Sequence, residues 1–175
     1  MALSFRYSND RDKARGCAAM AIALMACDAE DLISTVNLDA PAGSNMVMSH
    51  DFAYPANPCM GAKILWKNNV KDLRAMTTMV VANITCRSYL ADAKAPDADT
   101  LEAIRAAVHT EGADVCGLEA DECDRIYNSC MATVRRVFGH RSVMDATDRF
   151  AAHLVVRRSM SLSEIIEYLS SLGLR

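Results

Sequence analysis

Apolar residues recur at helical spacing through most of the chain, and residues 57–91 form its central stretch. Asn57 can cap a helix, and Pro58 suits the first helical position, where no N–H partner is needed. No charged residue occurs between Ala75 and Thr85, and a helix that is apolar on every side is normally buried. The pattern therefore predicts a long helix over 57–91 whose second half lies at the centre of the fold.

The β-branched residues between Thr77 and Thr85 would also suit a buried strand. A helix is favoured because residues 74–76 lead into this segment and residues 87–91 lead out of it without turn-forming residues. A strand in the middle of a continuous helical pattern would need turns at both ends. We therefore expect helix throughout.

Start and stop signals mark the remaining helices. Capping boxes are present at Asp99-Thr100-Leu101-Glu102 and at Ser161-Leu162-Ser163-Glu164. Gly112, Gly139 and Gly173 follow apolar stripes and are typical of helix ends. Five further helices are predicted, over residues 9–27, 99–112, 118–138, 142–158 and 161–173.

Residues 32–52 carry a different pattern. Two segments, 32–38 and 46–52, alternate apolar and polar residues, and the stretch between them contains Pro41 and Gly43. Such a pattern predicts two strands joined by a turn. The competing interpretation is a short helix that begins at Asp28, with Glu30 and Asp31 in its first turn.

Together these elements predict a mainly α fold. We expect one domain over residues 1–175, a bundle of about six helices around a buried central helix, with a small β-hairpin near residues 32–52. The low Gly and Pro content and the eleven methionines fit a helical protein with a pliable core.

The net charge of the chain limits the classes of partner that it would attract. The formal net charge is −3, which gives no general attraction to nucleic acid or to anionic lipid. The uncharged runs are too short for a membrane-spanning helix. Nucleic-acid binding is therefore disfavoured, and no membrane span is predicted.

The seven cysteines are odd in number and contain no CxxC pair, which fits reduced thiols in a cytoplasmic protein better than disulfides or a zinc site. Cys116, Cys123 and Cys130 recur every seven residues, too far apart along one helix to share a zinc ion, and are expected in the core. Leu24-Met25-Ala26-Cys27 resembles a lipoprotein cleavage box. However, Asp10 and Asp12 ahead of it suit a helix start better than a signal peptide.

A thiol site is one candidate for chemistry. Cys59 would lie in the first turn of the central helix, where the helix dipole and free N–H groups stabilise a thiolate. His50 and Asp51 lie just upstream and would complete a nucleophile–base–orienter arrangement. The alternative interpretation is that Cys59 is a small apolar residue near a helix end and His50 lies on the surface.

Two candidate binding features lie on the same predicted helix. Four basic residues form a row that would meet phosphates or an acidic partner, unless it is simply a solvated face: Lys63, Lys67, Lys71 and Arg74. Polar groups within the apolar half, together with apolar neighbours, would line a small-molecule pocket formed by Trp66, Met76, Thr77, Asn83 and Tyr89. The alternative interpretation is that these polar groups form hydrogen bonds to the backbone or to facing helices.

The sequence thus favours a non-enzymatic helical binding or interaction protein that associates with itself as a homodimer. The alternative is a small-molecule-binding or thiol-dependent enzyme that uses Cys59 and His50. No cofactor or metal motif is present in the sequence, because the usual His, Cys and Gly spacings are missing.

Overall fold

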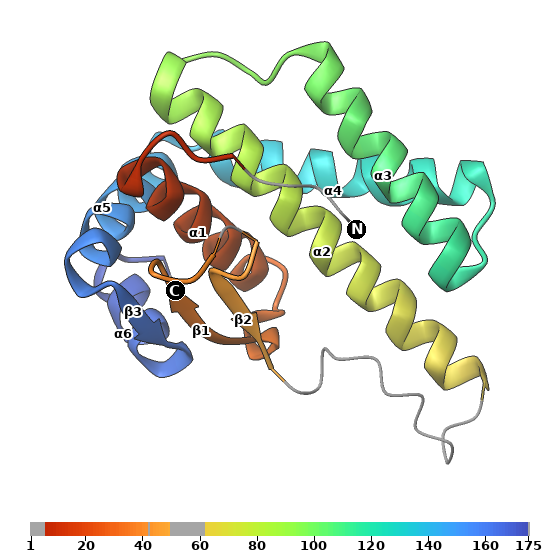
Figure 1. Cartoon of the computed structure of the whole chain (residues 1–175), viewed down its shortest axis with the longest axis horizontal. Coiled ribbons are helices and arrows are strands. Elements are labelled where there is room, and N and C mark those ends of the chain that lie inside the picture. The colour runs from red at the N-terminus through yellow and green to blue at the C-terminus, as the bar shows by residue number, and fades with distance from the viewer. Residues whose placement is uncertain (1–5, 42, 50–61, 175) are drawn as a thin grey trace.

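The computed structural model describes residues 6–41, 43–49 and 62–174, and within the second helix it describes side chains from Lys67 onward. The described part is mainly helical, as predicted (Figure 1). Its α-helices are α1 (Asp10–Met25), α2 (Ala62–Asp92), α3 (Ala98–Cys116), α4 (Ala120–Phe138), α5 (Arg141–Arg157) and α6 (Leu162–Ser171). A 3-10 turn, η1 (Glu30–Leu32), and three short strands complete it: β1 (Ile33–Asn37), β2 (Met46–Met48) and β3 (Ser159–Ser161).

Helix α2 runs across the whole molecule. In Figure 1, α3 lies on one side of it and α1, α5, the sheet and α6 on the other, while α4 packs across it. The charge-free segment from Ala75 is buried along most of its length, with Val81, Ala82 and Cys86 fully enclosed. The prediction of a buried central helix is therefore confirmed, and the choice of helix over strand for residues 77–85 is correct.

Helix α1 shares the centre with α2. Every residue from Gly16 to Leu24 is buried, because alanines and one glycine make α1 narrow enough for neighbours on all sides. A Cβ atom on Gly16 would lie 2.5 Å from Nδ2 of Asn83, so the two helices approach too closely there for any side chain. The close contact of α1 with α2 thus depends on small residues.

The predicted end of the third helix is wrong. Gly112 does not stop α3 but lies inside it, where a Cβ atom would come within 2.5 Å of Sγ of Cys123 on α4. The helix ends at Gly117, whose φ of 63° is the left-handed conformation that glycine adopts without strain. Its N-cap is Asp97, whose carboxylate accepts a hydrogen bond from the Thr100 N–H at 2.7 Å. Gly112 is therefore a packing residue.

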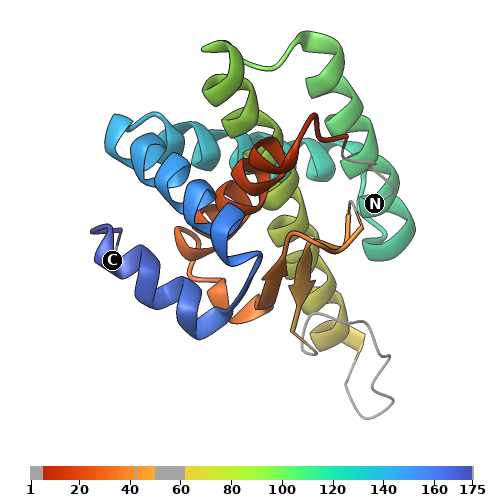
Figure 2. The same cartoon turned by 60° about the vertical axis from the view of Figure 1, so that its left-hand side comes forward.

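The hairpin prediction is confirmed for the described residues. Strands β1 and β2 pair antiparallel, and the competing helix is reduced to the single 3-10 turn η1. A third strand, β3, was not predicted; it pairs with the other edge of β1 and gives the order β2-β1-β3. Helix α6 follows β3 directly through the predicted capping box of Ser161 and Glu164, and packs beside the sheet (Figure 2).

Candidate functional site: two pockets beside one turn

Helix α1 ends in a turn that separates two cavities. We call residues 24–32 the dividing turn. The Leu24 carbonyl accepts hydrogen bonds from the N–H groups of Cys27 and Ala29, both at 3.0 Å, and Asp28 adopts a φ of 51°. From Ala26 to Glu30, successive residues line the two cavities alternately. Met25, Ala26, Asp28 and Glu30 line one cavity, and Leu24, Cys27, Ala29 and Leu32 line the other.

The second of these cavities has a volume of about 220 Å³ and lies between the dividing turn, α2 and α4. We call it the basic pocket, because Lys71 and Arg74 of α2 are the charged residues in its described lining, which contains no carboxylate. Its remaining walls are apolar or carry hydroxyl and thiol groups. These walls are formed by Leu24, Cys27, Ala29, Leu32, Ala75, Thr78, Ser129, Cys130 and Thr133.

The two cations face the pocket because of helical spacing. Residues three and four apart share a helix face, so Lys71, Arg74 and Thr78 line one strip of α2. Both basic side chains are exposed, and neither makes an ion pair with another residue in the described part of the chain. Among the described residues, no carboxylate lines the pocket beside these two cations.

The hydroxyl and thiol at the base of the pocket are held in place by the α2 backbone. The Thr78 hydroxyl donates a hydrogen bond to the Arg74 carbonyl at 2.8 Å, and Sγ of Cys130 lies 3.6 Å from the same oxygen. Burial raises the pKa of the Cys130 thiol, although Thr78 and Arg74 oppose the shift. Burial likewise raises the pKa of Cys27, the exposed thiol at the rim. Both thiols are therefore protonated near neutral pH.

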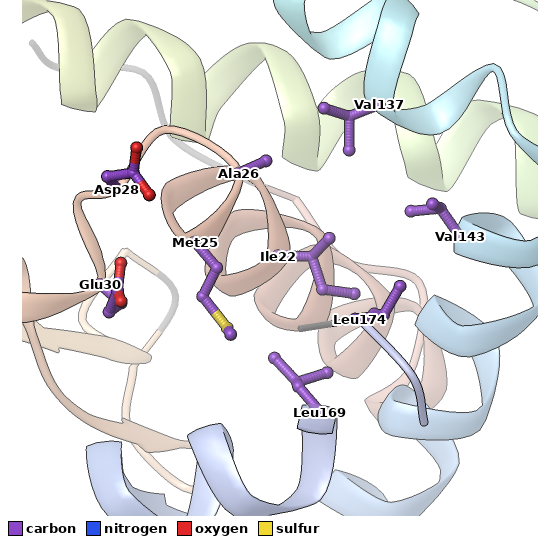
Figure 3. A pocket seen from close by; sticks show the side chains of 9 residues that line it. All are labelled: Ile22, Met25, Ala26, Asp28, Glu30, Val137, Val143, Leu169 and Leu174. Atoms are coloured by element: carbon purple, nitrogen blue, oxygen red, sulfur yellow. The ribbon is translucent and has the colours of Figure 1, made fainter. Parts of the chain in front are cut away.

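The first cavity has a volume of about 370 Å³ and lies between the dividing turn, the corner from α4 to α5, and the C-terminal segment. We call it the acidic pocket. Figure 3 shows Asp28 and Glu30 on one side of it, with Met25, Ile22 and Leu169 directed into the middle. Its other described walls are Ala26, Val137, Val143 and Leu174.

Only part of the predicted basic row lines a cavity. Lys71 and Arg74 line the basic pocket, whereas Lys67 is exposed on α2 and is not among the lining residues. The side chains of Lys63 and Trp66 lie outside the described residues. The half of the row that reaches the pocket is the half that faces the dividing turn and α4.

The predicted pocket residues on α2 are not gathered around either cavity. Thr77 is fully buried, and its hydroxyl donates to the Leu73 carbonyl of its own helix at 2.7 Å. Met76 is half-buried and Tyr89 is 42% exposed near the end of the helix. Asn83 belongs instead to a polar cluster between α1 and α2.

This cluster joins the start of α1 to the end of α2. Nδ2 of Asn83 donates to the Tyr7 hydroxyl at 3.2 Å, and Oδ1 of Asn83 accepts from Arg87. The Arg87 guanidinium binds both carboxylate oxygens of Asp12, at 2.6 and 2.7 Å, and lies 4.6 Å from the centre of the Tyr7 ring. Each group bonds to another member, so the cluster holds α1 on α2.

The thiol hypothesis falls on residues 50–61, since Cys59, His50 and Asp51 all lie outside the described residues. In the described ranges no group of three or more His, Cys, Asp or Glu side chains is arranged to hold a metal ion. Over the same ranges, no helix has the length and apolar character needed to cross a bilayer.

The lining residues of α4 were missed by sequence reasoning. Ser129, Cys130 and Thr133 share one helix face at i, i+1 and i+4, and the hydroxyl spacing was visible in the sequence. Nothing along the chain showed that this face meets Lys71 and Arg74, because that contact is tertiary.

Comparisons with known proteins leave the function open: no family model, no curated protein and no solved structure matches this chain.

Proposed function

We propose that this protein is a binding protein whose ligand is a small organic anion, held in the basic pocket. The observation that carries the proposal is the composition of that pocket. Two cations and several hydroxyl groups line it, and its described lining contains no carboxylate, in a chain whose net charge is −3. Such a concentration of positive charge against the overall sign favours an anion.

The walls also limit what the anion carries. Leu24, Ala29, Leu32 and Ala75 are apolar, so a short hydrocarbon group attached to the charged group would be removed from water there. A volume of about 220 Å³ lies below the range usual for drug-sized ligands. The pocket thus suits a phosphate monoester or carboxylate with a few carbon atoms.

Binding is favoured over thiol chemistry at this pocket. Cys27 and Cys130 line it, but burial raises both pKa values, and the protonated thiol is a poor nucleophile. The hydroxyl of Thr78 is engaged with the Arg74 carbonyl. We therefore infer that the ligand is held and released unchanged.

Titration calorimetry with n-butyl phosphate tests the proposal. We expect a dissociation constant of about 1 mM, from the ligand's nine heavy atoms at modest efficiency. Inorganic phosphate should bind more weakly because it lacks the apolar group. The Lys71→Gln/Arg74→Gln variant should lose binding. The control is Lys67→Gln, which removes the same kind of charge one turn away without touching the pocket.

Equal weakening by Lys67→Gln and by the pocket variant would show that the row acts only as a solvated positive face. Equal affinity for n-butyl phosphate and n-butylammonium would show that charge does not select the ligand. Either result contradicts the proposal.

Self-association is a second proposal, favoured by one observation. Strand β2 is an edge of the sheet, and its Val47 side chain is 46% exposed. An exposed edge with an apolar residue is a template for pairing with another chain. Light scattering after size exclusion should give the mass of a homodimer, and Val47→Lys should return the mass of one chain. A single-chain mass for the unaltered protein at high concentration would contradict it.

We also propose a cytoplasmic location. Among the described cysteines, Cys17, Cys27, Cys86, Cys123 and Cys130 are free thiols, and all of these except Cys27 are buried in the core. Reduced thiols persist in a reducing compartment. Fractionation of cells that express the tagged protein tests this, with a secreted fraction as the contrary result.

A further inference from the structure

We propose that the anion held in the basic pocket is a phosphate monoester, and that Ser129, Thr133 and Arg136 of α4 select it over a carboxylate. This inference rests on the proposed anion site and narrows its ligand. The anion site depends on the two cations of α2, whereas the selection depends on side chains of α4. Two observations support the inference: the free hydroxyl groups of α4 and a third cation on the same helix face.

The hydroxyl groups of α4 have no partner within the described part of the chain. Ser129 and Thr133 line the pocket, and neither side chain forms a hydrogen bond with another described residue. Threonines on other helices differ, because the hydroxyls of Thr77, Thr110 and Thr147 each donate to the carbonyl four residues earlier, at 2.7, 3.1 and 2.7 Å. The two hydroxyls of α4 therefore remain available to donate to a ligand.

Helical spacing places a cation on the same face of α4. Arg136 follows Thr133 by three positions and Ser129 by seven, so the three residues share one side of the helix. Arg136 is exposed and forms no ion pair with another described residue. Its guanidinium group therefore adds a positive charge to the row of hydroxyl groups.

The charge of Arg136 acts at the rim of the pocket. Burial raises the pKa of the Cys27 thiol, Arg136 lowers it, and Asp28 raises it by less than Arg136 lowers it. Cys27 lines the basic pocket, whereas Asp28 lines the acidic one. At this rim the cation therefore has the stronger effect of the two charges. Lys71, Arg74 and Arg136 together supply positive charge from two helices.

These groups match a phosphate monoester better than a carboxylate. A phosphate monoester carries about 1.5 to 2 negative charges near pH 7, with three terminal oxygens that accept hydrogen bonds. A carboxylate has a single charge and two oxygens. A third cation favours the additional charge, and the hydroxyls of α4 can donate to the additional oxygen. Both features therefore favour the phosphate.

The test compares three ligands that share a butyl group: n-butyl phosphate, n-butyl sulfate and pentanoate. n-Butyl sulfate has the tetrahedral shape of the phosphate and the single charge of the carboxylate. Binding is followed near pH 7 by NMR of protein labelled at alanine methyl groups, where Ala29 lies in the pocket wall. We expect n-butyl phosphate to bind about tenfold more tightly than pentanoate, the size of one hydrogen bond to a charged group. The affinity for n-butyl sulfate should lie between these two.

Variants of α4 separate selection from binding. Ser129→Ala/Thr133→Val should weaken n-butyl phosphate binding about tenfold and pentanoate binding clearly less. Arg136→Gln should weaken n-butyl phosphate binding about threefold, the size expected for one exposed ion pair. The matched controls are Asn128→Ala and Arg135→Gln, which alter exposed residues one position away and so on another face of α4. Circular dichroism confirms that all four variants are folded.

Two results would overturn this inference and leave the anion site standing. One is pentanoate binding as tightly as n-butyl phosphate. The other is a variant of α4 that loses no more affinity than its matched control, or that loses it equally for n-butyl phosphate and pentanoate. If none of the three anions shifts the Ala29 signal, the proposed anion site is itself wrong, and this inference is wrong with it.

Discussion

The basic and acidic pockets are neighbours with opposite chemistry. Both are bounded by the dividing turn, and each receives alternate side chains from it: Cys27 and Ala29 on one side, Ala26 and Asp28 on the other. The difference comes from the elements that pack opposite the dividing turn in each pocket. Helix α2 brings two cations to one side, whereas α5, α6 and the C-terminal segment bring apolar residues to the other.

The contrast teaches how one helix end can border two cavities with different linings. The C-terminal end of α1 carries the negative end of the helix dipole, so a cation nearby is favoured there. In the basic pocket Lys71 and Arg74 provide such cations. The described lining of the acidic pocket contains Asp28 and Glu30 and is otherwise apolar.

The largest expected effect is on the free energy of unfolding, and it differs between the walls of the two pockets. Leu24, in the basic pocket, is fully buried, whereas Met25, in the acidic pocket, is half-buried. Leu24→Ala should lower the free energy of unfolding by about 2–5 kcal/mol, because it leaves a cavity in the core. Met25→Ala should cost clearly less. Chemical denaturation measures both, and equal losses would mean that the two walls are equally part of the core.

Charge reversal should convert the basic pocket toward the character of its neighbour. The variant Lys71→Glu/Arg74→Glu should weaken n-butyl phosphate binding by at least about tenfold, since two attractive charges become repulsive. Lys67→Glu should weaken it much less, because that side chain does not line the pocket. Titration calorimetry measures the affinity for n-butyl phosphate in the unaltered protein and in both variants. An unchanged affinity in the double variant would remove the basis for the anion site.

Alkylation of Cys27 should report occupancy of the basic pocket alone. In a Cys59→Ser background, saturating n-butyl phosphate should slow iodoacetamide labelling of Cys27 several-fold, and n-butylammonium should not. Because burial raises the pKa of Cys27, labelling should continue to accelerate above pH 8.5, where an unperturbed thiol is half-ionised. Mass spectrometry of the labelled peptide follows the rate. Equal protection by the two ligands would contradict a site that selects anions.

The smallest effect concerns Asp72, which follows Lys71 on α2 but does not line the basic pocket. Burial raises its pKa in the folded protein, and Lys71 opposes the shift. The associated stability is therefore present below about pH 4, the unfolded value, and is lost as the pH rises through the folded pKa. Asp72→Asn should raise Tm slightly at neutral pH and leave it unchanged at pH 3. A lower Tm at neutral pH would show that the carboxylate is stabilised by a partner.

Local signals predicted most of the fold. The capping box at Ser161 and Glu164, the charge-free segment of α2 and the alternation in residues 32–38 each report on neighbours along the chain. Gly112 misled because a glycine that ends a helix and one that lets two helices touch are identical in sequence. Strand β3 was missed because three residues carry no periodicity, and their strand geometry comes from pairing with β1.

The sites were less predictable, for a physical reason. Lys71 and Arg74 were identified as a basic face, but their function as a pocket wall depends on Ser129 and Thr133 of α4, 55 or more positions away. No sequence pattern indicated the acidic pocket, because Asp28 and Glu30 are residue types that are common at the start of a helix. The thiol hypothesis for Cys59 and His50 stays a prediction.

The most direct test is an NMR titration of protein labelled at alanine methyl groups, because Ala26 lines the acidic pocket and Ala29 and Ala75 line the basic one. We predict that n-butyl phosphate shifts the Ala29 and Ala75 signals and leaves the Ala26 signal in place. If n-butyl phosphate shifts the Ala26 signal as much as the Ala29 and Ala75 signals, or shifts none of them, the assignment of the anion to the basic pocket is wrong.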